Sequence, residues 1–211
     1  MSVITYEDRL NSNHRWALME GSMHFEKESQ VFESMRRIAK RLEGIGVPYA
    51  IAGGMALFQH GYRRFTEDVD ILVTRESLAK IHEKLEGLGY YPPFSGSKHL
   101  RDAINGVKIE FIVTGDYPGD GKPKAVAFPD PSQIAVEIDE IQTINVPTLV
   151  QLKLASSAAP GRRKDLGDVQ ELIRRLNLPA EFESLIDPTM RELYRELWNE
   201  LQIGNDPHLQ G

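Results

Sequence analysis

The residues best suited to chemistry are two aspartates, Asp68 and Asp70, in the segment DVDILV. This short run rich in β-branched residues is typical of a β-strand. Alternate side chains of a strand share one face, so the valines and the isoleucine would point into a core and both aspartates would point the other way. Two carboxylates roughly 7 Å apart along a strand can converge on one or two divalent cations. The pair therefore predicts a metal site.

A third carboxylate, Glu110, lies in the later segment VKIEFIV. If this segment is a strand, Glu110 shares a face with Lys108 and Ile112, while the other residues form an apolar face. If the strand neighbours DVDILV, Glu110 comes within roughly 5 Å of the aspartate pair. Three such carboxylates predict a magnesium site built from oxygen ligands. A site of this kind suits phosphoryl or nucleotidyl transfer, in which metals activate the attacking oxygen and neutralise the leaving pyrophosphate.

The third feature is the pair Gly53-Gly54, which follows a predicted buried strand at 48–52 and opens a short helix. Glycine allows a phosphate to approach the backbone, and a helix N-terminus offers unpaired N–H groups and a positive dipole end. A triphosphate beside the carboxylates is the functional interpretation. The alternative for Gly53-Gly54 is an ordinary turn without a ligand. The alternative for Asp-x-Asp is two solvated aspartates that bind no metal. The hypothesis therefore depends on the ordered set of features.

The elements that must position these residues follow from apolar spacing. A helical stripe begins at Ser22 and ends at Gly44 and Gly46. The pair Asn105-Gly106, between apolar runs at 99–104 and 107–113, predicts a β-hairpin. One or two strands are expected over 134–146. Helices broken by prolines are expected from Pro147 to about Ile203.

This order of elements predicts an α/β (α+β) fold, in which a mixed sheet flanked by helices is followed by a helical C-terminal region. We divide the chain into three parts. Residues 1–21 show no clear period and form an N-terminal extension. Residues 22–146 form the sheet domain, and residues 147–211 form a helical region packed on it. The Gly- and Pro-rich segment 114–131 is expected to be a loop.

Composition narrows the possible classes of protein. The 211 residues include 25 Lys and Arg, 31 Asp and Glu and no cysteine, and the net charge is −6. Without cysteine there is no disulfide framework, thiolate zinc site or cysteine nucleophile. The excess of acidic over basic residues argues against a protein that binds DNA without sequence specificity. No apolar run approaches the roughly 20 residues that cross a bilayer, and the first residues lack a signal-peptide pattern. We expect a soluble, cytoplasmic protein with no membrane partner.

The segment AGGMALFQHGYRRFTEDVDILV resembles the signature of the DNA polymerase beta-like nucleotidyltransferase superfamily. Gly53, Gly54, Asp68, Asp70 and Glu110 fall on its positions. Two of these residues differ from the common pattern: Gly54 stands where many members have serine, and Glu110 where many have aspartate.

A second segment, LVQLKLASSAAPGRRKDLGDVQELI, is similar to the Lys…Arg-x-Lys-Asp-x-x-Asp region of AbiEii-like, or minimal, nucleotidyltransferases. The matching residues are Lys153, Arg162, Lys164, Asp165 and Asp168. The resemblance implies a nucleotidyltransferase fold that binds a nucleoside triphosphate and Mg²⁺, with two ions possible and Mn²⁺ as a substitute. It also implies a possible role in a toxin–antitoxin system, with a cognate antitoxin as partner.

The predicted roles of the site residues follow from these two resemblances and from charge. Asp68, Asp70 and Glu110 are the predicted catalytic and metal-binding residues, and Glu110 is also a candidate base for the acceptor hydroxyl. The predicted nucleotide-binding residues are Gly53, Gly54, Arg64, Thr66, Lys153, Lys164 and Asp168. For three of these residues a role without nucleotide stays open: Arg64 could be a solvated cation, Lys153 a surface lysine, and Asp168 a partner that orders Lys153.

The predicted function is magnesium-dependent transfer of a nucleoside monophosphate from a triphosphate, such as ATP, to an acceptor hydroxyl. That hydroxyl could belong to an RNA end, a protein or a small molecule. The first alternative is a catalytically silent nucleotidyltransferase fold that serves as a binding or regulatory module. A second alternative is a metal-dependent phosphohydrolase.

Overall fold

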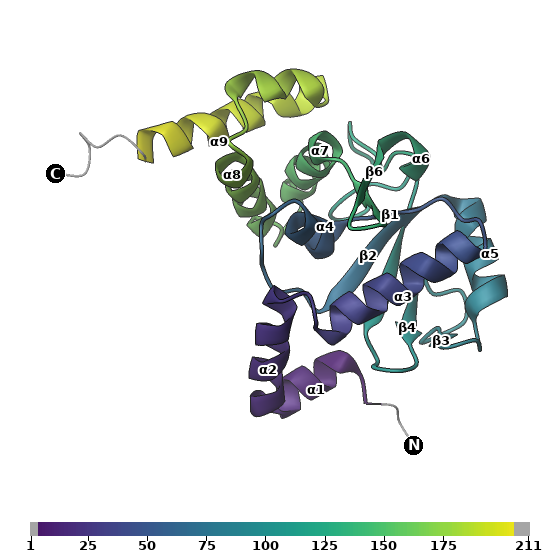
Figure 1. Cartoon of the computed structure of the whole chain (residues 1–211). Coiled ribbons are helices and arrows are strands. Elements are labelled where there is room, and N and C mark those ends of the chain that lie inside the picture. The colour runs from purple at the N-terminus through teal and green to yellow at the C-terminus, as the bar shows by residue number, and fades with distance from the viewer. Residues whose placement is uncertain (1–3, 205–211) are drawn as a thin grey trace. The chain divides into compact units, whose positions relative to one another are not determined.

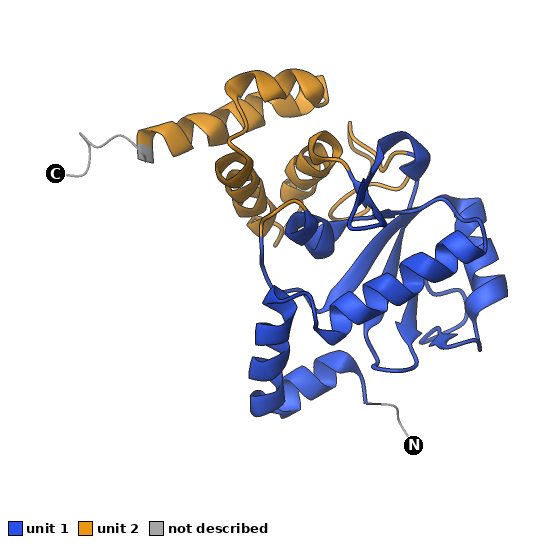
Figure 2. Ribbon diagram, viewed as in Figure 1, with its two compact units in different colours: residues 1–59, 63–114, 130–144 blue, residues 60–62, 115–129, 145–211 orange. Residues whose placement is uncertain are grey.

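The computed structural model describes residues 4–204, which form two compact units (Figures 1 and 2). The first unit spans residues 1–59, 63–114 and 130–144, and the second spans 60–62, 115–129 and 145–211, with the residues outside 4–204 not described. The predicted boundaries at 21/22 and 146/147, and the packing of the C-terminal region on the sheet domain, stay predictions. No helix among the described residues is both long and apolar enough to span a bilayer.

The first unit is a mixed sheet with helices, as the sequence predicts, and the sheet has seven strands. Its strands have the order β3-β4-β5-β2-β1-β7-β6. The strands are β1 (Ala50–Ile51), β2 (Asp68–Val73), β3 (Tyr90–Tyr91), β4 (His99–Asp102), β5 (Lys108–Val113), β6 (Ala135–Ile138) and β7 (Ile141–Ile144). The helices of this unit are α1 (Tyr6–Ser12), α2 (His14–Phe25), α3 (Gln30–Gly44), α4 (Gly53–Gln59), α5 (Arg75–Leu85) and α6 (Pro131–Ile134).

Pairing within the sheet is partly parallel and partly antiparallel. Strands β2 and β5 are parallel, as are β1 and β7. Strands β4 and β5 are antiparallel and are joined through Asn105-Gly106, so the predicted hairpin is confirmed. The two strands expected over 134–146 are the antiparallel pair β6 and β7.

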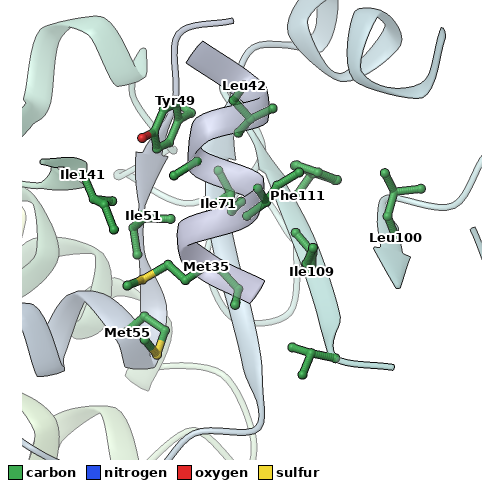
Figure 3. Packing of buried hydrophobic residues seen from close by; sticks show 14 of the residues in the cluster. Met35, Leu42, Tyr49, Ile51, Met55, Ile71, Leu100, Ile109, Phe111 and Ile141 are labelled. Atoms are coloured by element: carbon green, nitrogen blue, oxygen red, sulfur yellow. The ribbon is translucent and has the colours of Figure 1, made fainter. Parts of the chain in front are cut away.

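The core lies between one face of the sheet and helix α3. The buried stripe of α3 includes Met35 and Leu42, which pack with Ile71 of β2 and Phe111 of β5 (Figure 3). Burial alternates along β5, where Ile109, Phe111 and Val113 are buried and the residues between them are partly exposed. The polar residues of β2 and β5 therefore lie on the sheet face opposite α3.

The N-terminal segment differs from the prediction. Residues 6–25 form the two helices α1 and α2, where an extension without clear period was expected, and the helix expected from Ser22 is the end of α2 followed by α3. Side-chain caps explain the breaks. Asn13 accepts from the Trp16 amide, and Ser29 accepts from the Phe32 amide, so each starts a new helix. The fully buried Tyr6 donates to Glu20 at 3.0 Å, which ties α1 to α2.

The second unit is helical over its C-terminal part, as predicted. Its elements are α7 (Val146–Ser157), α8 (Lys164–Leu176), the 3₁₀ helices η1 (Ala180–Leu185) and η2 (Pro188–Met190), and α9 (Arg191–Gly204). Proline begins or precedes several of them: Pro147 lies in the first turn of α7, Pro179 caps η1 and Pro188 starts η2. Within the loop expected at 114–131, residues 115–129 contain no helix or strand, whereas Pro131 begins α6 of the first unit.

A buried ionic cluster fixes the β4–β5 hairpin to α3. Asp102, 1% exposed, accepts from Arg37 Nη2 at 2.8 Å and from Ser34 Oγ at 2.9 Å. It also accepts from the backbone amide of Ile104 at 2.9 Å. Because the carboxylate is removed from water, its partners must satisfy it.

We expect Asp102→Asn to lower the free energy of unfolding by about 2–3 kcal/mol, since the substitution leaves the Arg37 guanidinium without its buried counter-charge. Urea unfolding followed by circular dichroism measures this change. The matched control is Asp139→Asn, which removes an exposed ion pair with Lys27 and should cost less than about 1 kcal/mol. Equal losses in the two variants would contradict a structural role for the buried cluster.

Candidate active site

The parallel register of β2 and β5 brings the three predicted carboxylates together. Asp70 lies directly opposite Glu110, and Asp68 lies opposite Lys108. One carboxylate oxygen from each of Asp68, Asp70 and Glu110 can be chosen so that all three lie within 4.8 Å of one another. All three residues are partly buried. The prediction that the two strands are neighbours, with Glu110 beside the aspartate pair, is therefore confirmed.

The donor set suits a hard divalent cation. Carboxylate oxygens are the ligands that Mg²⁺ and Mn²⁺ prefer. Two oxygens on one octahedral Mg²⁺ are about 2.9 Å apart when cis and about 4.2 Å apart when trans, so the three side chains would have to draw closer together to share one ion. Among residues 4–204, this is the one group of three or more acidic or histidine side chains close enough to share a metal.

Gly53 has a structural reason to be glycine at this site. It has φ +57°, a conformation that residues with a side chain rarely adopt. A Cβ atom at Gly53 would lie 1.8 Å from Asp70 Oδ2. A side chain at position 53 would thus displace the carboxylate. The expectation that the pair opens a helix is confirmed by α4, and its contact with phosphate stays a prediction.

Gly54 and Thr66 form a second close contact in the same place. A Cβ atom at Gly54 would lie 2.7 Å from Thr66 Oγ1, so the glycine makes room for that hydroxyl. Thr66 Oγ1 in turn donates to Asp68 Oδ1 at 3.0 Å. The predicted nucleotide-binding residue Thr66 therefore orients one of the carboxylates, and each glycine of the pair packs against a residue that forms or supports the carboxylate group.

The turn before Asp68 is held by a residue that the sequence did not single out. His24 is fully buried, and its Nε2 lies 3.2 Å from the backbone carbonyl of Arg64. Its Nδ1 lies 3.1 Å from Ser29 Oγ, and the ring packs against Phe58 and Phe65. Burial lowers the pKa of His24 to about 4, so the ring is neutral at pH 7 and bonds the turn without charge. No histidine spacing in the sequence would have revealed this role.

Lys108 is the second residue that the sequence did not place in the site, although strand alternation already put it on the same face as Glu110. Its Nζ donates to Glu110 Oε2. Burial lowers the pKa of Lys108, but the hydrogen bond to Glu110 and the charges of Glu110, Asp68 and Asp70 outweigh that effect, and the pKa is raised overall. The lysine is therefore charged and lies within the electrostatic field of all three carboxylates.

Two of the predicted basic residues of the second unit, Lys153 and Arg162, take part in an ion-pair cluster. Lys153 on α7 is 8% exposed, and its Nζ donates to Asp165 Oδ1 at 2.8 Å and to Asp168 Oδ2 at 2.6 Å on α8. Burial raises the pKa of Asp165, but Lys153, Ser156 and Arg162 outweigh it, so the pKa is lowered. The alternative of Lys153 as a surface lysine is wrong, because the side chain is buried. Lys164 begins α8 and is exposed.

The cluster joins Lys153 to Asp168, one of the two arrangements considered for that aspartate. It stays a prediction that nucleotide binding involves Lys153, Lys164 and Asp168. A contact between Arg64 and phosphate also stays a prediction.

No family model matches this sequence, and no curated protein matches it. Solved structures do match. The antibiotic-resistance factor ANT(2″)-Ia in solution has 14% identity, with 82% of this chain and 93% of that chain covered and a TM-score of 0.48. ANT(2″)-Ia in complex with adenylyl-2″-tobramycin has 16% identity, with 78% and 96% covered and a TM-score of 0.49.

The lincosamide antibiotic adenylyltransferase LnuA, with lincomycin bound, has 17% identity, with 66% of this chain and 96% of that chain covered and a TM-score of 0.45. At these identities and TM-scores the similarity decides neither the fold nor the chemistry of this chain. Both depend on the geometry of its own residues.

We expect Gly53→Ala to weaken binding of Mn²⁺ by roughly 10- to 100-fold, because the new Cβ forces the Asp70 carboxylate out of place. Isothermal titration calorimetry measures the affinity, and circular dichroism establishes that the variant is folded. The matched control is Gly21→Ala in α2, where an added Cβ has no heavy atom within 4 Å. An affinity in Gly53→Ala equal to that of the wild type would show that Asp70 is not part of the metal site.

Proposed function

We propose that this protein is a nucleotidyltransferase that depends on Mg²⁺, with Mn²⁺ as a substitute, and that transfers a nucleoside monophosphate to an acceptor hydroxyl. The observation that carries the proposal is the convergence of Asp68, Asp70 and Glu110 on one face of adjacent parallel strands. Three carboxylates next to a glycine pair at a helix start make a site for a metal-bound triphosphate. The sequence resemblance to the polymerase beta-like superfamily supports the same chemistry.

The bound metal would neutralise the triphosphate and favour ionisation of the attacking hydroxyl. The chain's own residues have distinct tasks around it. Asp68 and Asp70 would hold the cation, and Glu110 would complete the site and accept the proton of the acceptor hydroxyl. Thr66 keeps Asp68 in one orientation through its hydroxyl. Gly53 and Gly54 would leave backbone N–H groups accessible to the triphosphate, while Arg64 would supply positive charge.

The acceptor hydroxyl could belong to an RNA end, a protein or a small molecule. ANT(2″)-Ia is described in complex with adenylyl-2″-tobramycin and LnuA with lincomycin, so both are associated with antibiotics. The resemblance of 149–173 to AbiEii-like enzymes favours a macromolecular acceptor and a place in a toxin–antitoxin system with a cognate antitoxin. A cytoplasmic location would agree with either kind of acceptor.

The test uses each of ATP, GTP, CTP and UTP labelled at the α-phosphate, with Mg²⁺ and with total RNA, lysate protein or a small-molecule extract. We expect label to enter one acceptor class with release of pyrophosphate. Asp68→Asn and Asp70→Asn should lower the rate by about 10³-fold or more, because metal ligation supplies several kcal/mol of transition-state stabilisation. Asp139→Asn, an exposed aspartate of the same unit, is the matched control.

Two results separate the alternatives. Metal-dependent nucleotide binding without transfer of label to any acceptor would support the catalytically silent module, and label released as free nucleotide would support the phosphohydrolase. A wild-type protein that binds no triphosphate in the presence of Mg²⁺ would contradict the proposed function.

A further inference from the structure

Lys108 is a cationic side chain beside the three carboxylates that could hold a metal cation. It lies on β5, two residues before Glu110 and on the same face of the sheet, and its register partner on β2 is Asp68. Its side chain is 26% exposed, so much of it is removed from water. Its Nζ donates to Oε2 of Glu110, the third of the converging carboxylates. A cationic group thus already contacts one of the oxygens available to a metal.

Charge balance explains why a lysine is tolerated there. Three carboxylates within 4.8 Å repel one another, and the repulsion is stronger where the side chains are partly buried. An ammonium group on a flexible four-carbon stem can offset that repulsion and can also leave, because its hydrogen bond to Glu110 is a single contact. Two cations cannot share the same carboxylate oxygen without repelling each other.

We infer that Lys108 is the resident counter-cation of the carboxylate group and competes with the divalent metal for Glu110. This inference rests on the proposed function, since it concerns the same metal site. In the metal-free protein Lys108 holds Glu110 beside the aspartates. When a divalent ion takes Oε2 of Glu110, the ammonium group must move off that oxygen. Lys108 is accordingly a positioning residue that lowers the affinity of the site for metal while it holds the Glu110 side chain in place.

The experiment compares Mn²⁺ affinities of the full-length protein by isothermal titration calorimetry, supported by electron paramagnetic resonance of free Mn²⁺. We expect Lys108→Gln to bind Mn²⁺ roughly three- to tenfold more tightly than the wild type, because the competing cation is gone. Lys108→Arg keeps the charge and should bind no more tightly than the wild type. The matched control is Lys40→Gln on the exposed surface of α3, which makes the same charge change on the opposite side of the sheet and should shift the affinity less than about twofold.

A second readout separates competition from a merely structural role. Without metal, Lys108→Gln should melt at a lower temperature than the wild type, because the carboxylates then repel without an offset. Saturating Mn²⁺ should raise its melting temperature by more than it raises that of the wild type. A purely structural lysine would leave the rise in melting temperature unchanged or smaller.

The outcomes are distinct. Unchanged or weaker Mn²⁺ binding in Lys108→Gln, or equal tightening in Lys108→Arg, would overturn the inference while leaving the metal site intact. Absence of Mn²⁺ binding in the wild type, or wild-type affinity in Asp70→Asn, would instead overturn the metal site of the proposed function.

Discussion

The in-register pairing of the parallel strands β2 and β5 is the constraint on which the candidate site depends. It places Asp70 opposite Glu110, and strand alternation then puts Asp68 and Lys108 on the same face. The register is fixed from the other side of the sheet, where Ile71 and Phe111 pack under α3 (Figure 3). A slip of one residue would turn the carboxylates into the core and the apolar residues into solvent, so the hydrophobic core and the polar site enforce the same alignment.

Close packing and neutral hydrogen bonds then fix the individual carboxylates. Gly53 leaves room for Asp70, and Gly54 leaves room for the Thr66 hydroxyl that bonds Asp68. The turn that carries Thr66 is tied through the Arg64 carbonyl to His24, whose buried ring is uncharged at pH 7. Residues distant in sequence thus hold the geometry of the site without adding charge to it. The charged groups of the site are its three carboxylates and Lys108.

Much of this arrangement could be predicted from the sequence because it depends on local periodicity. Alternation along DVDILV and VKIEFIV gives the polar face, and Asn105-Gly106 gives the hairpin that leads into β5. The role of His24 and the burial of Lys153 could not be predicted, because the burial of a single polar residue depends on contacts distant in sequence. The sequence does not predict the break between α2 and α3, because the apolar stripe runs across it and the cap at Ser29 is a short polar signal that any loop could carry.

The central claim is that Asp68, Asp70 and Glu110 hold a divalent cation. Crystals grown with Mn²⁺ and a non-hydrolysable nucleoside triphosphate test it most directly, through anomalous scattering from manganese. The account predicts an anomalous peak in contact with oxygens of all three carboxylates, and loss of that peak in Asp70→Asn. A protein crystallised under the same conditions with no peak at these residues, or with its only peak elsewhere, would contradict the account.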